Sequence, residues 1–295
     1  MGGSTLAFTK MHGLGNDFIV VDNTGGNVVL GAERIRRLAD RHTGIGFDQL
    51  LVVQASTRPT AAFDYRIYNA DGGEVGHCGN GARCFARFVH DRGLIKVKKF
   101  TVNTQSGLIE LSLLDDGRVT VGMGTPTFVP EEVPFLPDVS TTMRRASDQS
   151  NAPVLAIGQH RLDVDGDILQ VGIVGIGNPH VVLPVANVDS APVATLGPRL
   201  ERDPRFPERV NVGFVERVDA SRIRLRVFER GVGETRACGT GACAAVAVGQ
   251  QQGQLDRRVN VSLSGGELNI FHANSDAVIE MTGPCSTVFE GHTRM

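Results

Sequence analysis

The chain has 295 residues, a formal net charge of −2, and 41% hydrophobic and 21% charged residues. This is the length of two domains and the composition of an ordinary globular protein, and the charge gives no basic surface for nucleic acid. Because the N-terminus lacks a signal pattern and no apolar run could span a membrane, we expect a cytoplasmic protein without nucleic-acid or membrane partners.

Short strands dominate the pattern in the first part of the chain. Apolar or alternating runs bounded by turn residues predict strands at residues 17–22, 48–53, 63–68, 98–104, 108–114 and 118–121. Asp115, Asp116 and Gly117 predict a hairpin turn between the last two of these strands. Helices are predicted at residues 33–41, which are amphipathic, and at residues 82–91.

A proline-rich segment separates this part from a second series of strands. Prolines at positions 126, 130, 134 and 137, followed by a polar stretch to residue 151, predict a linker. Beyond it, strands are predicted at residues 154–157, 169–176, 180–183, 212–215, 223–228, 259–263 and 278–281. One convincing longer helix is predicted there, at residues 242–251.

Two segments of the chain have nearly the same sequence. Residues 66–82 read RIYNADGGEVGHCGNGA and residues 226–242 read RVFERGVGETRACGTGA, with seven of 17 positions identical. The repeat extends to a Gly-x-Gly-Asn turn and to the amide residues Gln49 and Asn211, both at a spacing of 162 residues. The order of turn, strand, amide residue, cysteine loop and helix therefore occurs twice.

This duplication predicts an α+β fold made of two pseudo-symmetric domains. Each domain is expected to be a curved, mostly antiparallel and barrel-like sheet around a central helix. We place the first domain at residues 1–124, with the tail 277–295 returning to it, and the second domain at residues 125–276. The alternative is a single large β domain whose glycine loops match by coincidence.

Each copy of the repeat places one cysteine, Cys78 or Cys238, directly before a Gly-x-Gly-Ala turn that opens a helix. A helix N-terminus offers unpaired N–H groups and a positive dipole end, and glycine lets an anion approach the backbone closely. The same setting is expected to lower the pKa of the cysteine. The N–H groups expected to bind a carboxylate there belong to Gly79, Asn80, Gly239 and Thr240.

Two thiols on either side of an α-carbon suit the inversion of a stereocentre. One cysteine, as thiolate, would remove the α-proton, and the other, as thiol, would protonate the opposite face. A helix dipole contributes only about 0.3–1 kcal/mol, whereas an N–H donor aimed at a developing oxyanion contributes about 2.7–4 kcal/mol. We therefore expect the N–H donors on the carboxylate to dominate the stabilisation of the carbanion.

The motifs that carry this chemistry resemble those of the diaminopimelate epimerase family. The segments MHGLGNDFIVVD, NADGGEVGHCGNGARC, GNPHVV and RVFERGVGETRACGTGACA look like family motifs, and they run from residue 11 to residue 244. The resemblance implies an isomerase that interconverts LL- and meso-diaminopimelate in lysine and peptidoglycan precursor synthesis. It implies no pyridoxal phosphate or other cofactor, and a homodimer.

The resemblance also implies the residues of the site. Cys78 and Cys238 correspond to the catalytic cysteines, and His180 and Glu229 to a histidine and a glutamate that support them. Chemically, Arg230 suits bidentate binding of the distal carboxylate. The implied substrate-binding positions are Asn16, Gln49, Asn69, Asn80, Asn178, Asn211, Glu229, Arg230, Gly239 and Thr240.

Other interpretations of the same residues stay open. A proline racemase would use two thiols but has no use for Arg230, and an isomerase with a carboxylate base would lack the cysteine pair. A phosphate- or nucleotide-binding module would need a Gly-Lys-Ser/Thr ending, and a redox dithiol protein a C-x-x-C motif. A metal site is not expected, because C-x₂-C spacing is missing. The remaining cysteines, Cys84, Cys243 and Cys285, are expected to be core or spectator residues.

Overall fold

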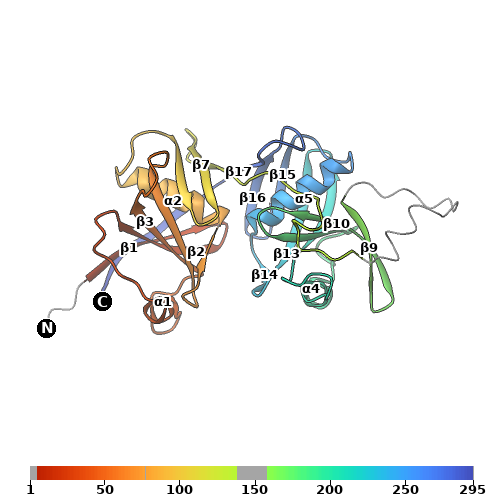
Figure 1. Ribbon diagram of the computed structural model, residues 1–295, viewed down its shortest axis with the longest axis horizontal. Helices are drawn as coiled ribbons and strands as arrows, with labels where there is room; N and C mark the ends of the chain where they lie inside the picture. The colour runs from red at the N-terminus through yellow and green to blue at the C-terminus, as the bar shows by residue number, and fades with distance from the viewer. Residues whose placement is uncertain (1–4, 77, 138–157, 295) are drawn as a thin grey trace. The chain divides into compact units, whose positions relative to one another are not determined.

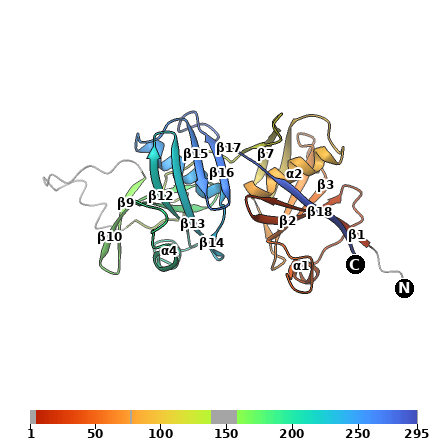
Figure 2. The ribbon, with the colours of Figure 1, turned by 180° about the vertical axis from the view of Figure 1, so that it is seen from behind.

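The computed structural model describes residues 5–76, 78–137 and 158–294 and divides into two compact units (Figures 1 and 2). Unit 1 contains Met1–Gly122 and Met281–Met295, and unit 2 contains Met123–Glu280. In Figure 2 the blue C-terminal strand runs beside the red N-terminal strand, with which it pairs in antiparallel fashion. The domain limits expected from the sequence, at residues 124 and 277, stay a prediction. A division into compact units does not by itself show which segments fold as domains.

Unit 1 is a sheet built around one long helix. Its elements are β1 (Thr5–Gly13), β2 (Asn16–Asn23), α1 (Ala32–Ala39), β3 (Gln49–Ala55), β4 (Phe63–Asn69), β5 (Glu74–Val75), α2 (Gly79–Asp91), β6 (Lys99–Thr104), β7 (Gly107–Leu113), β8 (Val119–Gly122), β17 (Glu280–Gly283) and β18 (Ser286–Arg294). Hydrogen bonds link them in the order β18–β1–β2–β3–β4–β6–β7–β8–β17, with β5 on β4. The pairs β2–β3 and β4–β6 are parallel, and β18–β1, β1–β2, β3–β4, β6–β7 and β7–β8 are antiparallel.

Unit 2 repeats this arrangement. Its elements are β9 (Gln159–Val164), β10 (Asp167–Gly175), β11 (Pro179–Pro184), α4 (Val193–Glu201), β12 (Asn211–Asp219), β13 (Arg222–Glu229), β14 (Gly233–Thr235), α5 (Gly239–Gln251), β15 (Arg258–Leu263) and β16 (Gly266–Phe271). The strands pair in the order β9–β10–β11–β12–β13–β15–β16, with β14 on β13. The pairs β11–β12 and β13–β15 are parallel, at the same places as the parallel pairs of unit 1.

The pairing register shows the duplication residue by residue. Phe18 of β2 pairs with Gln49 of β3, and His180 of β11 pairs with Asn211 of β12. Each residue of the second pair lies 162 positions after its counterpart in the first. The predicted α+β fold with mostly antiparallel strands and few helices is therefore confirmed.

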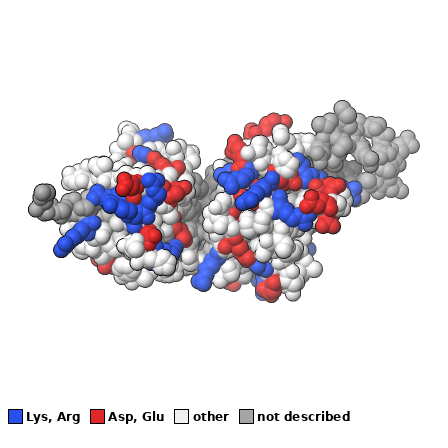
Figure 3. Space-filling model, turned by 90° about the horizontal axis from the view of Figure 1, so that it is seen from below, with Lys and Arg blue, Asp and Glu red and all other residues white. Residues whose placement is uncertain are grey.

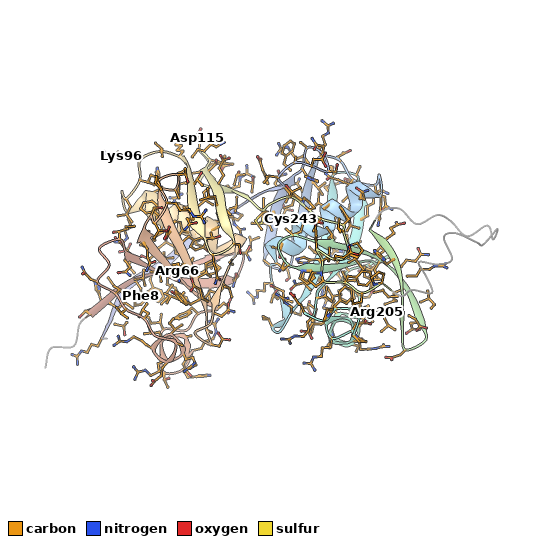
Figure 4. The ribbon with its side chains drawn as sticks, viewed as in Figure 1. Phe8, Arg66, Lys96, Asp115, Arg205 and Cys243 are labelled. Carbon is orange, nitrogen blue, oxygen red and sulfur yellow. The ribbon has the colours of Figure 1, made fainter. Side chains whose placement is uncertain are left out.

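A buried helix lies at the centre of each unit. α2 contacts β1, β2, β3, β7 and β8, and α5 contacts β10, β11, β12, β13 and β16. Because α5 has small or apolar residues around most of its surface, strands can pack against several sides of it. The approach is close at Gly172 of β10, where a Cβ would lie 2.3 Å from Val248 Cγ1. Cys243 of α5 is fully buried inside unit 2 (Figure 4).

The described part of the predicted linker, residues 125–137, packs against unit 2. Val133 and Phe135 are buried in the apolar core of unit 2, and Thr127 forms a β-bridge with Gly175. Prolines in this segment therefore shape a chain that packs against the sheet. The polar stretch from residue 138 and the predicted strand at 154–157 lie outside the described residues.

Several elements were not predicted, for identifiable reasons. The helix α4 contains Pro198 and a glycine, Gly197, against which the ring of Phe228 packs, so its periodicity is weak. The unpredicted strands carry many polar residues or are very short, and they are β1, β5, β9, β14, β16 and β18. The strand predicted at residues 278–281 lies two residues later, at Glu280–Gly283.

Charged side chains are mixed on the surface. On the face shown in Figure 3, Lys and Arg side chains alternate with Asp and Glu side chains over both units. No helix in the described part of the chain is long and apolar enough to cross a membrane.

Candidate active site

A charged hairpin precedes the cysteine loop in each unit. Arg66 of β4 (labelled in Figure 4) donates through Nε and NH2 to the two carboxylate oxygens of Glu74 on β5. Arg226 of β13 does the same to Glu234 on β14, at 2.7 and 3.0 Å. These residues are the shared Arg and Glu of the repeat, so their role is to hold together the hairpin that leads into each cysteine.

Each cysteine is the N-cap of its central helix. Cys78 and Cys238 have extended backbones, with φ of −148° and −121°, and each sulfur accepts the N–H of the glycine three residues later, at 3.4 Å. The helices thus begin at Gly79 and Gly239, three residues earlier than predicted, so the Gly-x-Gly sequence forms the first helical turn. Both thiols lie at the positive end of a helix, where carboxylate binding is favoured.

The second glycine of each loop is required by close packing. A Cβ at Gly81 would lie 2.5 Å from the hydroxyl oxygen of Tyr65, which is fully buried. A Cβ at Gly241 would lie 3.1 Å from Val227 Cγ2 and 3.3 Å from Cys238 Sγ. The helix start therefore approaches the neighbouring strand more closely than a side chain would allow.

The surroundings of Cys238 favour its thiol form. Burial raises the pKa of Cys238 well above its ordinary value, and the charge of Glu229 and a hydrogen bond with it raise the pKa further. Hydrogen bonds from Thr240 and from the N–H of Gly241 act in the opposite direction but do not outweigh burial. The expectation of a lowered pKa is therefore wrong for this cysteine, because the sequence does not reveal how completely the loop is buried.

Two sets of hydrogen bonds hold four of the predicted site residues of unit 2. His180 Nε2 hydrogen-bonds Asn178 Oδ1 at 2.9 Å, and Asn211 lies beside His180 in the parallel register. Asn211 donates to the carbonyl of Pro179 at 3.1 Å and accepts the N–H of Arg230 at 3.0 Å. Burial, with the charge of Arg230, lowers the pKa of His180 to about 3, so this histidine is neutral at pH 7.

Four amide residues predicted for the site form two hydrogen-bonded pairs in unit 1, and three of the four stand at the ends of strands β2, β3 and β4. Asn80 donates to Asn16 Oδ1 at 3.4 Å, and Gln49 donates to Asn69 Oδ1 at 2.8 Å. Gln49 Oε1 is buried and accepts no hydrogen bond from the described residues. An acceptor in this state suits a ligand that brings a donor, such as an ammonium group.

A salt-bridge network next to Asn16 was not predicted. Asn16 donates to Asp48 at 2.8 Å, and Arg41 binds both Asp48 and Asp17 at 2.7 Å, while Lys10 also binds Asp17. Burial raises the pKa of Asp17, but hydrogen bonds from Arg41 and Lys10 outweigh it and hold the pKa well below its ordinary value. These charges therefore fix the turn that carries Asn16.

Glu201, at the end of α4, was also missed. Its carboxylate is buried and accepts the N–H of Gly231 at 3.0 Å and a hydrogen bond from Arg209 at 3.3 Å. Arg230, the neighbour of Gly231, donates to the carbonyl of Glu208 at 2.9 Å. Glu201 thus holds the hairpin that carries Arg230. The sequence gives no signal for this contact, because α4 itself was not recognised.

The predicted site residues fall in both units. Those of unit 1 are Asn16, Gln49, Asn69, Cys78, Gly79 and Asn80, and those of unit 2 are Asn178, His180, Asn211, Glu229, Arg230, Cys238, Gly239 and Thr240. Within residues 5–76, 78–137 and 158–294, no three His, Cys, Asp or Glu side chains cluster so that they could hold a metal ion.

Solved structures share this fold. A hydroxyproline epimerase from Agrobacterium vitis, with bound trans-4-hydroxy-L-proline, matches with a TM-score of 0.66 and 14% identity over 99% of this chain and 93% of that chain. A phenazine biosynthesis protein of the PhzF family from Bacillus anthracis matches with a TM-score of 0.64 and 18% identity over 99% and 100% of the two chains. At these identities the likeness concerns the fold, which is the two-domain fold of these epimerases and PhzF proteins.

Sequence comparison identifies the family within this fold. The family described as diaminopimelate epimerase matches residues 8–129 and 172–288. A diaminopimelate epimerase of Aromatoleum aromaticum is 54% identical over 97% of this chain and 98% of its own length, and one of Azotobacter vinelandii is 50% identical over 98% and 99%. The chain belongs to the diaminopimelate epimerase family, as its motifs indicated.

Proposed function

We propose that this chain interconverts LL- and meso-diaminopimelate by direct proton transfer at the α-carbon, without a cofactor. The observation that carries the proposal is the pair of cysteine N-caps, one in each unit, at the start of a buried helix. Relatives named diaminopimelate epimerase, 54% and 50% identical over nearly the whole chain, support the choice of substrate. The reaction would serve lysine and peptidoglycan precursor synthesis.

In the proposed reaction, the thiolate of one cysteine removes the α-proton and the thiol of the other protonates the opposite face. Cys238 rests as a thiol because burial and Glu229 raise its pKa, so it is ready to donate a proton. When the reaction runs in the other direction, Glu229 is the group that takes the proton of Cys238. His180, neutral at pH 7, would support a thiol by hydrogen bonding and not as a cation.

The substrate carboxylate next to the reacting carbon is assigned to the two helix starts. The donors would be the N–H groups of Gly79, Asn80, Gly239 and Thr240. Each donor aimed at the charge that develops on this carboxylate is worth about 2.7–4 kcal/mol. Together they would lower the barrier to forming an enolate-like carbanion far more than the helix dipoles, which contribute about 0.3–1 kcal/mol each.

The rest of the substrate is assigned to the polar networks. Arg230 would bind the distal carboxylate, and its position is braced by Asn211 and by the carbonyl of Glu208. Gln49, with its buried acceptor oxygen, would hold the reacting ammonium together with Asn16. Asn69, Asn178 and Asn211 would bind polar atoms of the substrate without adding charge.

The proposal is tested with purified protein and LL-diaminopimelate, in an assay coupled to a dehydrogenase specific for the meso isomer. We expect turnover without added pyridoxal phosphate and in the presence of a chelator, and no turnover of L-proline or trans-4-hydroxy-L-proline. In D₂O the product should carry deuterium at the inverted α-carbon. Turnover of proline in place of diaminopimelate, or product without deuterium, would contradict the proposal.

We also propose that the protein is a cytoplasmic homodimer. The support for a dimer is β18, an edge strand whose Val288 and Phe289 are 56% and 47% exposed. Exposed apolar side chains on an edge strand favour association. Light scattering on the purified protein tests the dimer, and Phe289→Ser should shift the mass toward that of a monomer.

A further inference from the structure

Two cysteines that the proposed reaction does not use lie against each other in unit 1. Cys84 is a fully buried residue of α2, and Cys285 is a half-buried residue in the connection between β17 and β18. Cys285 donates to the carbonyl of Arg83, the residue directly before Cys84, at 3.4 Å, and each of the two thiols shifts the pKa of the other. In return, Arg83 Nε donates to the carbonyl of Pro284 at 3.1 Å, so the helix and the connection hold each other at this point.

The two thiols differ in reactivity. The hydrogen bond from Cys84 lowers the pKa of Cys285, and although burial acts in the opposite direction, the charges of Arg83 and Arg87 lower it further. Burial raises the pKa of Cys84 well above its ordinary value. Cys285 is therefore the partly exposed sulfur that loses its proton more readily, and Cys84 is the protected thiol beside it. This division matches a sulfur that reacts with peroxide and one that resolves the product.

We propose that Cys84 and Cys285 form a second thiol pair, which a hydroperoxide converts to a disulfide joining α2 to the β17–β18 connection. The Cys285 thiolate attacks the terminal peroxide oxygen, the O–O bond breaks, and hydroxide or alkoxide leaves, so that Cys285 becomes a sulfenic acid. The Cys84 sulfur then attacks the Cys285 sulfur, the S–O bond breaks, and water leaves with the proton of Cys84. A thiol reductant reverses the reaction by exchange.

The position of the pair gives this disulfide a structural consequence. Cys84 lies six residues after Cys78 on the same helix, so the bond would fasten the first two turns of α2 to the returning C-terminal strand. To form the bond, the two sulfur atoms must approach to about 2.05 Å. Because both cysteines belong to unit 1, the bond can form without any change in the other unit. The proposal does not depend on the proposed epimerase activity.

The first experiment isolates the pair. The variant Cys78→Ser/Cys238→Ser/Cys243→Ser retains Cys84 and Cys285, and it is treated with hydrogen peroxide at neutral pH and analysed by non-reducing peptide mass spectrometry. We expect loss of both free thiols, a linked peptide containing Cys84 and Cys285, and recovery of both thiols with dithiothreitol. The same mapping on the unsubstituted protein gives the result even if the triple variant is poorly folded.

Two control variants separate the roles of the sulfurs. Cys84→Ala should leave Cys285 as a sulfenic acid that dimedone labels, whereas Cys285→Ala should leave Cys84 unreactive until the protein is unfolded. The proposal is overturned if peroxide oxidises Cys285 in the Cys84→Ala variant but leaves no Cys84–Cys285 link in the parent protein. It is also overturned if the link appears only after unfolding in urea.

Discussion

The two cysteine loops share one backbone geometry but differ in the groups around it. In both units an extended cysteine caps the central helix, and its sulfur accepts an N–H at 3.4 Å. Glu229 interacts with Cys238, and His180 lies on β11 of the same unit. The positions that match these two ionisable residues in unit 1 hold Phe18 and Asn69. Cys238 is buried, and Cys78 is half-buried.

This difference separates two tasks. The helix cap is retained in both copies because a reversible proton transfer needs a thiol on each side that can act as acid or as base. In the proposed binding mode the substrate has one orientation, so a second Arg230 or Glu229 would serve no further group, and the ionisable side chains can differ. The comparison therefore predicts symmetrical effects for changes in the caps and asymmetrical effects for changes in the surrounding side chains.

Loss of either cap sulfur should have the largest effect. Cys78→Ser and Cys238→Ser each replace the thiol by a much weaker acid of similar size, so we expect kcat to fall about 10²–10⁴-fold in both variants. The coupled epimerase assay measures this, and Cys243→Ser, a buried cysteine on α5 outside the loop, serves as control. If the Cys78→Ser variant had the activity of the control, the prediction of equal effects and the two-thiol mechanism would both be contradicted.

Arg230 should show the next largest effect, with no counterpart in unit 1, where Ala70 stands at its position. Arg230→Lys removes the bidentate geometry, and loss of a charged hydrogen bond costs about 1.5–3 kcal/mol, or about 10–150-fold in kcat/KM. The loss should lie mainly in KM for diaminopimelate. Arg224→Lys, on the strand β13 that ends directly before Arg230 but paired with Asp189 and Glu216, is the matched control. Equal losses in both variants would contradict the assignment.

His180 should make unit 2 sensitive to acid. The unfolded chain binds a proton on this histidine near pH 6.5, whereas burial delays protonation in the folded chain to about pH 3. Unfolding therefore takes up a proton in this window, and stability falls with falling pH by up to about 1.4 kcal/mol per pH unit. His180→Phe, which installs the residue of unit 1, should flatten this slope. Urea unfolding at pH steps from neutral to acid measures it, and identical slopes for the two proteins would contradict the prediction.

Gly81 and Gly241, each three residues after the cysteine N-cap, should differ in their tolerance of a methyl group. Gly81→Ala places a Cβ 2.5 Å from the hydroxyl of Tyr65, whose ring is buried and packed against Phe85, so we expect a loss of about 1–3 kcal/mol. At Gly241 the nearest atom lies at 3.1 Å, and the strain is offset by about 1 kcal/mol of helix propensity. Urea unfolding should therefore rank Gly81→Ala as the less stable variant, and the opposite order would contradict the packing argument.

Local patterns predicted most of the strands and both central helices, because β4 and β13 alternate in hydrophobicity and the repeat marks both helix starts. The strand β18 was not predicted, since it is exposed over most of its length and pairs with residues far away in the chain. The site residues followed from the family motifs, and the hydrogen bonds of Asn178 with His180 and of Asn211 with Arg230 emerged only in the structure.

What the sequence could not provide was burial. The raised pKa of Cys238 depends on its desolvation beside Glu229, and the contact of Glu201 with Gly231 joins residues 30 positions apart through a helix that was not predicted. The sequence shows that Arg and Glu are identical in the two copies of the repeat. That each Arg–Glu pair holds a hairpin together is seen only from the hydrogen bonds of the folded chain.

Removal of the Arg–Glu pairs of the two hairpins should have the smallest effect on stability and the closest agreement between the two units. Double-mutant cycles with Arg66→Gln and Glu74→Gln, and with Arg226→Gln and Glu234→Gln, measure the coupling free energy of each pair from urea unfolding. Partly exposed ion pairs contribute about 0.2–1 kcal/mol, and the bidentate geometry is the same in both hairpins. We therefore expect the two coupling energies to agree within about 0.5 kcal/mol. A strong coupling energy in one unit and none in the other would contradict this expectation. It would mean that different interactions stabilise the two hairpins, although the two helix caps share one geometry.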